Sequence, residues 1–277
     1  MTQSEQSGAD VARYYDDNTR WFLRIDPSRA RVIHRPVWAA GVRTLADAAH
    51  YVHARISSAL PARRPLRLLD LGCGVGESSF WLAEHARVET LGISISEKQI
   101  AITETTARTR GLAERCAFRR GDFMDLGALP AIDAAFAIEA FAHASDAAKF
   151  FAEAARVLPS GAPLFLCDDF VAGTPSPERA ECLARLAKGW HFHSLFTRDE
   201  VVRLAEAAGF RLERVEVLTP HLRLHSSPLL SLLERAGGAL FRLWPSSLVD
   251  NMIGGTALQQ SERRGWTEYA LLELRRG

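Results

Sequence analysis

The nine residues LLDLGCGVG, residues 68–76, join a short apolar segment to three closely spaced glycines. The leucines of this segment indicate a buried strand over residues 66–71, and residues 77–85 after the glycines indicate a helix. Glycines let the backbone turn tightly and approach a ligand where a Cβ would collide. They are Gly72, Gly74 and Gly76. The pattern predicts a loop that binds a nucleotide-containing cofactor, and a tight turn without a ligand is the alternative interpretation.

The spacing of the glycines distinguishes two kinds of cofactor. A dinucleotide fingerprint, G-x-G-x-x-G, requires a third glycine where this chain has Glu77. A carboxylate at the start of the helix would repel a pyrophosphate, because both compete for the positive end of the helix. A cofactor with an ammonium group fits better, since Asp70 at the end of the strand can face it. S-adenosylmethionine is such a cofactor.

The stretch LDLGCGVGESS, residues 69–79, resembles the first motif of the class I S-adenosylmethionine-dependent methyltransferases. The resemblance implies a doubly wound, Rossmann-like α/β fold, with a mostly parallel seven-stranded sheet and helices on both faces. It also implies that S-adenosylmethionine is the cofactor and that the turn holds it. The residues concerned are Asp70, Gly72, Cys73, Gly74 and Gly76.

Composition argues against several classes of protein. The 277 residues are 47% apolar, enough for one domain with an accessory segment or for two small domains. The 34 basic and 33 acidic residues are intermixed, so no nucleic-acid partner is expected. The four cysteines have no C-x-x-C spacing, which favours reduced thiols in the cytoplasm and predicts no metal site. Neither a signal-peptide pattern nor an apolar run of about 18 residues predicts membrane insertion.

From residue 66 onward, apolar strands alternate with amphipathic helices, as in a parallel sheet covered on both faces. Strands are expected at 66–71, 87–93, 116–121, 132–138, 163–168, 210–217 and 266–276, and helices between them at 146–158 and 198–208. The resemblance implies that the last strand lies antiparallel at the sheet edge. Helical stretches at 9–24 and 41–60 precede the sheet. The expected parts are an N-terminal helical cap (1–65) and a methyltransferase domain (66–277) with lid insertions at about 171–195 and 220–264.

The cap and both insertions are expected to cover the carboxyl ends of the strands, where ligands bind in open α/β sheets. The segment YYDDNTRWFLRIDP, residues 14–27, resembles the lead-in of the cyclopropane synthase branch. This implies that Tyr15 and the His34-Arg35 pair contact the cofactor carboxylate or the substrate. The alternative is that the aromatic residues form a helix face that docks on the domain.

The resemblance extends to the turns after the second and third strands. SISEKQ, residues 94–99, resembles the T-L-S-x-x-Q pattern of cyclopropane-forming and γ-tocopherol-type methyltransferases, which implies that a glutamine reaches the cofactor ribose. Helix capping is the other role open to the serines. The next turn resembles the motif whose carboxylate binds the adenine amino group, and an Asx turn is its alternative. The residues implied are Ser94, Ile95, Gln99, Gly121, Asp122 and Phe123.

IEAFAHA, residues 138–144, resembles segments of sterol side-chain and tocopherol methyltransferases. Glu139 is the leading catalytic candidate and also a candidate cofactor contact. A carboxylate here can stabilise the carbocation formed when an alkene attacks the methyl group, and can then accept its proton. A purely structural role, in which Glu139 helps to order the site near the cofactor, is equally open. His143 is a candidate general base, and a bond to a backbone carbonyl is its alternative.

Further residues are candidates for binding the substrate. Asp168 and Asp169 end the fifth strand, where one of two neighbours must point away from the crevice. The two aspartates could hold a metal or a cationic substrate. His191 and His193, in the first insertion, lack a third residue that would complete a zinc site, and they could instead contact an anion such as a diphosphate. The candidates are His34, Asp169, His191 and His193. The apolar segment 228–248 predicts a lid or a dimer face, and its two arginines are too few for membrane-surface docking.

The tocopherol, sterol and cyclopropane resemblances all concern alkylation at carbon. They imply S-adenosylmethionine-dependent C-methylation of a hydrophobic small molecule, isoprenoid-like (terpenoid) or aromatic, in natural-product biosynthesis. O- or N-methylation in a secondary-metabolite pathway is the alternative. A cofactor-binding subunit without catalysis and a nicotinamide oxidoreductase are more distant ones.

Overall fold

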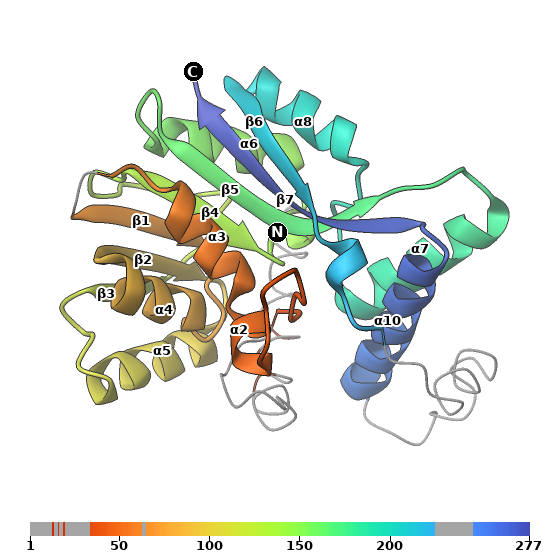
Figure 1. The fold of residues 1–277 in the computed structure, drawn as a ribbon, viewed down its shortest axis with the longest axis horizontal. Helices are drawn as coiled ribbons and strands as arrows, with labels where there is room; N and C mark the ends of the chain where they lie inside the picture. Colours follow the sequence, from red (N-terminus) through yellow and green to blue (C-terminus); the bar gives the residue numbers. More distant parts are fainter. Residues whose placement is uncertain (1–12, 14–15, 17–18, 20–33, 63–64, 225–245) are drawn as a thin grey trace.

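The computed structural model of the chain describes residues 13, 16, 19, 34–62, 65–224 and 246–277. Within these residues, seven strands form one sheet in the order β3-β2-β1-β4-β5-β7-β6 (Figure 1). They are β1 (Leu66–Leu71), β2 (Val88–Ser94), β3 (Cys116–Arg120), β4 (Ala134–Ile138), β5 (Pro163–Val171), β6 (Phe210–Val217) and β7 (Thr267–Arg276). All strand pairs are parallel except the two that β7 forms, with β5 and with β6, which are antiparallel. The predicted doubly wound, mostly parallel sheet is confirmed.

The last strand is antiparallel as predicted, but its predicted place at the sheet edge is wrong. Strand β7 lies between β5 and β6, so β6 forms the edge. Most residues of β7 are buried, whereas the charged residues of β6 leave much of that strand exposed or half-buried. A strand with apolar residues toward both faces belongs inside a sheet, and a charged strand protects its edge.

Helices cover both faces of the sheet, because apolar residues alternate along the strands. In β1, Leu66 and Leu68 face one cluster, while Leu69 and Leu71 face the other. The first face carries α3 (Tyr51–Ala59), α4 (Glu77–Ala86) and α5 (Glu97–Thr109); the second carries α6 (Ala147–Val157) and α8 (Arg198–Ala207).

Helix α3, preceded by the short α2 (Leu45–Ala49), packs on the sheet face and not over the strand ends. Its Val52 and Ile56 are buried against Leu68 and Phe136. The prediction that residues 41–60 cover the carboxyl ends is therefore wrong for α3. The four-residue spacing of its apolar side chains forms a stripe that the apolar sheet face can bury.

The two insertions meet beside the sheet. Helix α7 (Pro177–Trp190) begins at a serine cap followed by proline, and it packs against α10 (Ser246–Arg263). A Cβ on Gly189 would lie 2.5 Å from the backbone nitrogen of Gly254, so the two helices touch through glycine. Most of the segment 228–248 lies outside the described residues. Among the helices that the structure does describe, none has the length and apolar character needed to cross a membrane.

Candidate functional site

The glycine turn is packed between the ends of three strands. Gly72, Gly74 and Gly76 all have positive φ, at 92°, 52° and 85°. The backbone N–H groups of Gly72 and Cys73 donate to the carbonyl of Ile93 at the end of β2, at 3.0 and 2.9 Å. A Cβ on Gly72 would lie 2.5 Å from the Cβ of Ala140, which follows β4. All three positions need glycine for its conformation. Gly72 and Gly76 also need it for space, whereas a Cβ on Gly74 would meet no atom within 4 Å.

Gly72→Ala should lower the free energy of unfolding by about 3 kcal/mol, because the new methyl group collides with Ala140 and the φ of 92° is unfavourable for alanine. Chemical denaturation measures this loss. Gly111→Ala is the matched control, since Gly111 also has positive φ but open space around it. It should cost only about 1 kcal/mol. Equal losses in the two variants would contradict the collision.

Asp70 is a buried acid without a cationic partner among the described residues. It is 3% exposed, and one carboxylate oxygen accepts a hydrogen bond from Ser79 Oγ at 2.8 Å. Burial raises its pKa to about 7, although the bond from Ser79 opposes the shift. A carboxylate desolvated in this way gains much from a positive group brought beside it. Asp70 therefore fits the ammonium group of the predicted cofactor.

The turn after β2 is closed by the N-terminal segment. Ser94 Oγ donates to Gln99 Oε1 at 2.7 Å, and Gln99 Nε2 donates to Thr19 Oγ1 at 3.3 Å. Ser96 caps α5 by accepting from the backbone of Gln99, and its hydroxyl also bonds Asp16. The capping role is thus confirmed for Ser96, while the ribose contact of Gln99 stays a prediction. Ile95 between the serines is half-buried.

The turn after β3 adopts the predicted local alternative. Asp122 Oδ1 accepts from the backbone N–H of Met124 at 2.8 Å, which is an Asx turn. The N–H of Gly121 donates to the carbonyl of Ser94, so the ends of β2 and β3 lie together. The ring of Phe123 packs edge-on against Phe150. The adenine contacts predicted for this turn remain predictions, and Tyr15 lies outside the described residues.

Glu139 stands at the end of β4 in a strained conformation. Its φ is +50°, in the left-handed region that glutamate rarely occupies, and its N–H donates to the carbonyl of Cys167 on β5. Backbone N–H and Nε of Arg35 both donate to Glu139 Oε1, at 3.0 and 3.2 Å. Strain of this kind persists only where surrounding contacts hold it and is frequent at functional sites.

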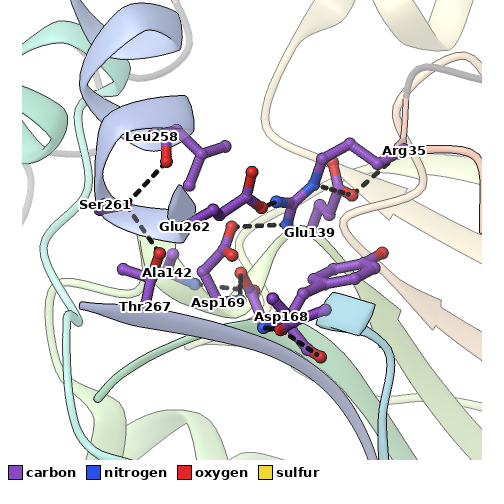
Figure 2. A network of polar contacts seen from close by, with 11 residues as sticks. Arg35, Glu139, Ala142, Asp168, Asp169, Leu258, Ser261, Glu262 and Thr267 are labelled. Atoms are coloured by element: carbon purple, nitrogen blue, oxygen red, sulfur yellow. Dashed lines mark hydrogen bonds and ion pairs between the residues drawn. The ribbon is translucent and has the colours of Figure 1, made fainter. Parts of the chain in front are cut away.

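Arg35 gathers three carboxylates from distant parts of the chain (Figure 2). Besides Glu139, its Nη2 donates to Asp169 Oδ2 at 2.6 Å and its Nη1 donates to Glu262 on α10. The guanidinium also lies over the ring of Tyr269 on β7, 3.9 Å from the ring centre. We call Arg35, Glu139, Asp169 and Glu262 the acid cluster.

Carboxyl groups outnumber the single guanidinium in the acid cluster. Burial opposes ionisation of Glu139, but the charge of the Arg35 guanidinium and the hydrogen bond from the Arg35 backbone hold its pKa below the ordinary value. Burial instead raises the pKa of Asp169, and it raises that of Glu262 to about 7. Glu139 is thus the acid of the cluster that stays ionised most readily. One guanidinium among three carboxylates leaves the site favourable to an additional positive charge.

Asp168 is buried beside the acid cluster but does not join it. Its two carboxylate oxygens accept from the backbone N–H groups of Asp169 and Ala142, at 2.9 and 3.1 Å (Figure 2). Burial, together with the neighbouring charge of Asp169, raises its pKa to about 7. Of the two predicted aspartates, only Asp169 contacts Arg35. Asp168 instead fixes the backbone after Glu139.

The histidines predicted for the site form two groups. His143, on the short helix η1 (Phe141–His143), donates from Nδ1 to the carbonyl of His191 at 3.3 Å. The N–H of His193 donates to the carbonyl of Ala142, which brings this loop to η1. Burial lowers the pKa of His143 to about 4, so its ring is neutral and a weak base. His34 lies elsewhere, with its Nε2 3.0 Å from Nε2 of His53.

Sequence patterns did not reveal several members of the site. Glu262 comes from the second insertion and Tyr269 from the last strand, 123 and 130 positions after Glu139. The sequence patterns indicated Tyr15 as a contact of the cofactor or substrate but gave no role to the nearby Asp16 and Thr19. Glu262 and Tyr269 stand in no motif, and Asp16 and Thr19 lie in the segment 14–27 but at positions given no role there. Only Arg35, noted next to His34, could have indicated the cluster.

Comparison with known proteins gives consistent matches. Residues 69–166 match the family described as Methyltransferase domain. The chain is 31% identical over 184 residues to 24-methylenesterol C-methyltransferase 2 of Oryza sativa subsp. japonica, covering 64% of this chain and 50% of that protein. It is also 31% identical to 27-O-demethylrifamycin SV methyltransferase of Amycolatopsis mediterranei (strain S699), covering 69% and 71%. Among solved structures, mycolic acid cyclopropane synthase CmaA1 complexed with SAH and CTAB has a TM-score of 0.78 at 21% identity, covering 97% and 98%.

Proposed function

This chain belongs to the class I S-adenosylmethionine-dependent methyltransferases, and we propose that it methylates a carbon atom of a hydrophobic, isoprenoid-like or aromatic small molecule. The observation that carries the proposal is the ionised Glu139 at the end of β4, beside the glycine turn and within an acid-rich cluster. The sterol C-methyltransferase among its relatives agrees with carbon as the acceptor.

The residues of the turns fit the cofactor that this family uses. Asp70 supplies a buried negative charge, and Gly74 leaves open space where other residues would project a side chain. We propose that Asp70 binds the ammonium group, Gln99 the ribose and Asp122 the adenine. The cofactor supplies an electrophilic methyl group when bound. The protein must then align the acceptor carbon with that methyl group and exclude water.

Glu139 would act on the charge that develops in the substrate. When an alkene or aromatic carbon gains a methyl group, the substrate becomes cationic, and a fixed carboxylate lowers the energy of that state. Arg35 holds Glu139 ionised and in one orientation. The same excess of carboxylates would repel an anionic group, so we propose that the part of the substrate facing Glu139 is uncharged.

Methylation of oxygen or nitrogen is the second candidate. The Amycolatopsis relative is named for O-demethylrifamycin, and His143 lies close enough to Glu139 for the charge of Glu139 to act on its ring. Such a reaction needs a proton acceptor but creates no carbocation. The low pKa of His143 makes it a weak base, which supports the carbon assignment over this one.

We also propose that the part of the N-terminal cap (1–65) that precedes α2, together with the insertions at about 171–195 and 220–264, closes the site. Asp16 bonds Ser96 at the start of α5, and Glu262 of the second insertion reaches Arg35. Contacts from both sides thus meet over the strand ends. A lid of this kind would keep water from the reacting groups.

Incubation with methyl-labelled S-adenosylmethionine and four acceptors tests the proposed chemistry. The acceptors are a sterol with a side-chain alkene, geranyl diphosphate, a phenol and a secondary amine. We expect methylation of the uncharged alkene, with NMR placing the label on carbon. A label on oxygen or nitrogen would establish the second candidate, and preference for geranyl diphosphate would contradict an uncharged substrate end.

A further inference from the structure

Three histidine rings form a continuous chain of nitrogen contacts next to the acid cluster. His34 Nε2 lies 3.0 Å from His53 Nε2, and His53 Nδ1 lies 3.0 Å from His50 Nδ1. His53 is fully buried and His50 is half-buried. We call His34, His53 and His50 the histidine chain. It runs from the residue beside Arg35, through the interior, to the surface of α3.

The rings of the histidine chain are held in place by their surroundings. Trp81 on α4 stacks on both His50 and His53, with ring centres 5.6 Å apart in each case. Ser78 Oγ lies 2.8 Å from His53 Nε2. His53 thus has a fixed partner at each ring nitrogen, and this is the arrangement that successive N–H···N hydrogen bonds require.

The rings are uncharged at neutral pH. Burial lowers the pKa of His34 and His53, and it lowers that of His50 to about 4. The charged and titratable groups that act on the histidine chain from neighbouring elements are Glu139, Arg35, Asp47, His85 and Arg110. A neutral imidazole has one donor and one acceptor nitrogen, so it can accept a proton on one side and release another on the opposite side.

Two opposite orientations of the protons satisfy both contacts, and in one of them His34 can accept a proton at Nδ1. His34 Nε2–H donates to His53 Nε2, and His53 Nδ1–H donates to His50 Nδ1. His34 Nδ1 then carries a lone pair. This atom is buried and makes no hydrogen bond to any residue that the structure describes. His34 directly precedes Arg35 in the chain. The backbone N–H of Arg35 donates to Glu139, and the charge of Glu139 acts on the His34 ring.

We propose that the histidine chain carries the proton released by methyl transfer from Glu139 to the surface. The inference rests on the proposed function. The C–H electron pair of the methylated cation becomes the new C=C bond, and its proton passes to the Glu139 carboxylate and then, through one bridging water molecule, to His34 Nδ1. The Nε2 proton of His34 moves to His53 Nε2, the Nδ1 proton of His53 moves to His50 Nδ1, and His50 releases its Nε2 proton to water.

The hydrogen bonds of the chain can be tested without any substrate. Nitrogen-15 NMR of the histidine-labelled full-length protein detects couplings across N–H···N bonds. We expect couplings between His34 and His53 and between His53 and His50, with the proton on Nε2 of His34 and on Nδ1 of His53. Absence of either coupling would overturn the relay, even if methylation occurs on carbon.

The function of the chain is tested by breaking it at two points. His53→Asn interrupts the buried link, and His50→Gln interrupts the exposed end, where folding is less at risk. Each should lower kcat at least tenfold and change the solvent deuterium isotope effect, with KM unchanged, on whichever of the four acceptors is methylated. His85→Asn is the control, because His85 stacks on Trp81 outside the chain.

The outcomes separate the two proposals. An unchanged kcat and isotope effect in both chain variants would overturn the relay while leaving C-methylation in place. Methylation on oxygen or nitrogen would overturn the proposed function alone. The released proton would then come from the heteroatom, and loss of kcat in His53→Asn and His50→Gln would still support the relay.

Discussion

Glu139→Gln should reduce turnover by about two orders of magnitude while the affinity for cofactor product changes far less. Glutamine preserves the shape of the side chain and can still accept from the Arg35 backbone and Nε. It removes the negative charge that would stabilise a substrate cation. Steady-state kinetics give the turnover, and calorimetry with S-adenosylhomocysteine gives the affinity.

The fold should tolerate this substitution. Arg35 keeps its ion pairs with Asp169 and Glu262, so its guanidinium is not left buried without a partner. A melting temperature close to the native value would confirm that lost turnover is not lost structure. His143→Ala is the companion variant. Native-like turnover of Glu139→Gln together with an inactive His143→Ala would replace carbon alkylation by heteroatom methylation with a histidine base.

Asp70→Asn should weaken cofactor binding at least 100-fold, because the cofactor ammonium would be buried without its charged partner, at a cost of about 3 kcal/mol. Asparagine keeps an oxygen that accepts from Ser79, so the turn retains that hydrogen bond. Calorimetry with S-adenosylhomocysteine measures the loss. Unchanged affinity would show that Asp70 does not hold the ammonium group.

The same variant should make the free protein more stable above neutral pH. The pKa of Asp70 rises from 3.8 to about 7 on folding, so the folded state retains a proton that the unfolded state has lost. The contribution of Asp70 to stability is therefore largest below pH 3.8 and falls as the pH rises toward 7. Asp70→Asn removes this pH dependence, and at pH 8 it should raise the free energy of unfolding by about 1–3 kcal/mol. Urea denaturation at pH 5 and pH 8 tests the sign.

Local sequence signals were enough to predict most of the fold. The apolar alternation of β1 and the glycines that follow it specify a strand, a turn and a helix within about twenty residues. Strand β6 was predicted at its observed bounds, and serine, aspartate and threonine caps begin α5, α6 and α8 close to the predicted positions. These signals are readable because hydrophobic periodicity and capping act between residues a few positions apart.

Motif spacing also indicated Glu139 and Asp169, since Glu139 follows β4, Asp169 lies close to the carboxyl end of β5, and such ends meet at one edge of the sheet. It could not indicate their shared partner. Arg35 lies 104 positions before Glu139 and 227 before Glu262, in a segment with no periodic pattern toward the sheet. The histidine chain likewise joins His34 to α3 across 19 positions.

Such contacts depend on how the segments outside the alternating strands and helices pack against the sheet. The left-handed φ of Glu139 also depends on the tertiary structure, because hydrogen bonds from distant residues hold this backbone against its local preference. Candidate residues for cofactor binding could thus be proposed from the order of amino acids alone. The charge balance around Glu139 and the route for its proton emerge only when distant segments are folded together, because charges interact through space and not along the chain.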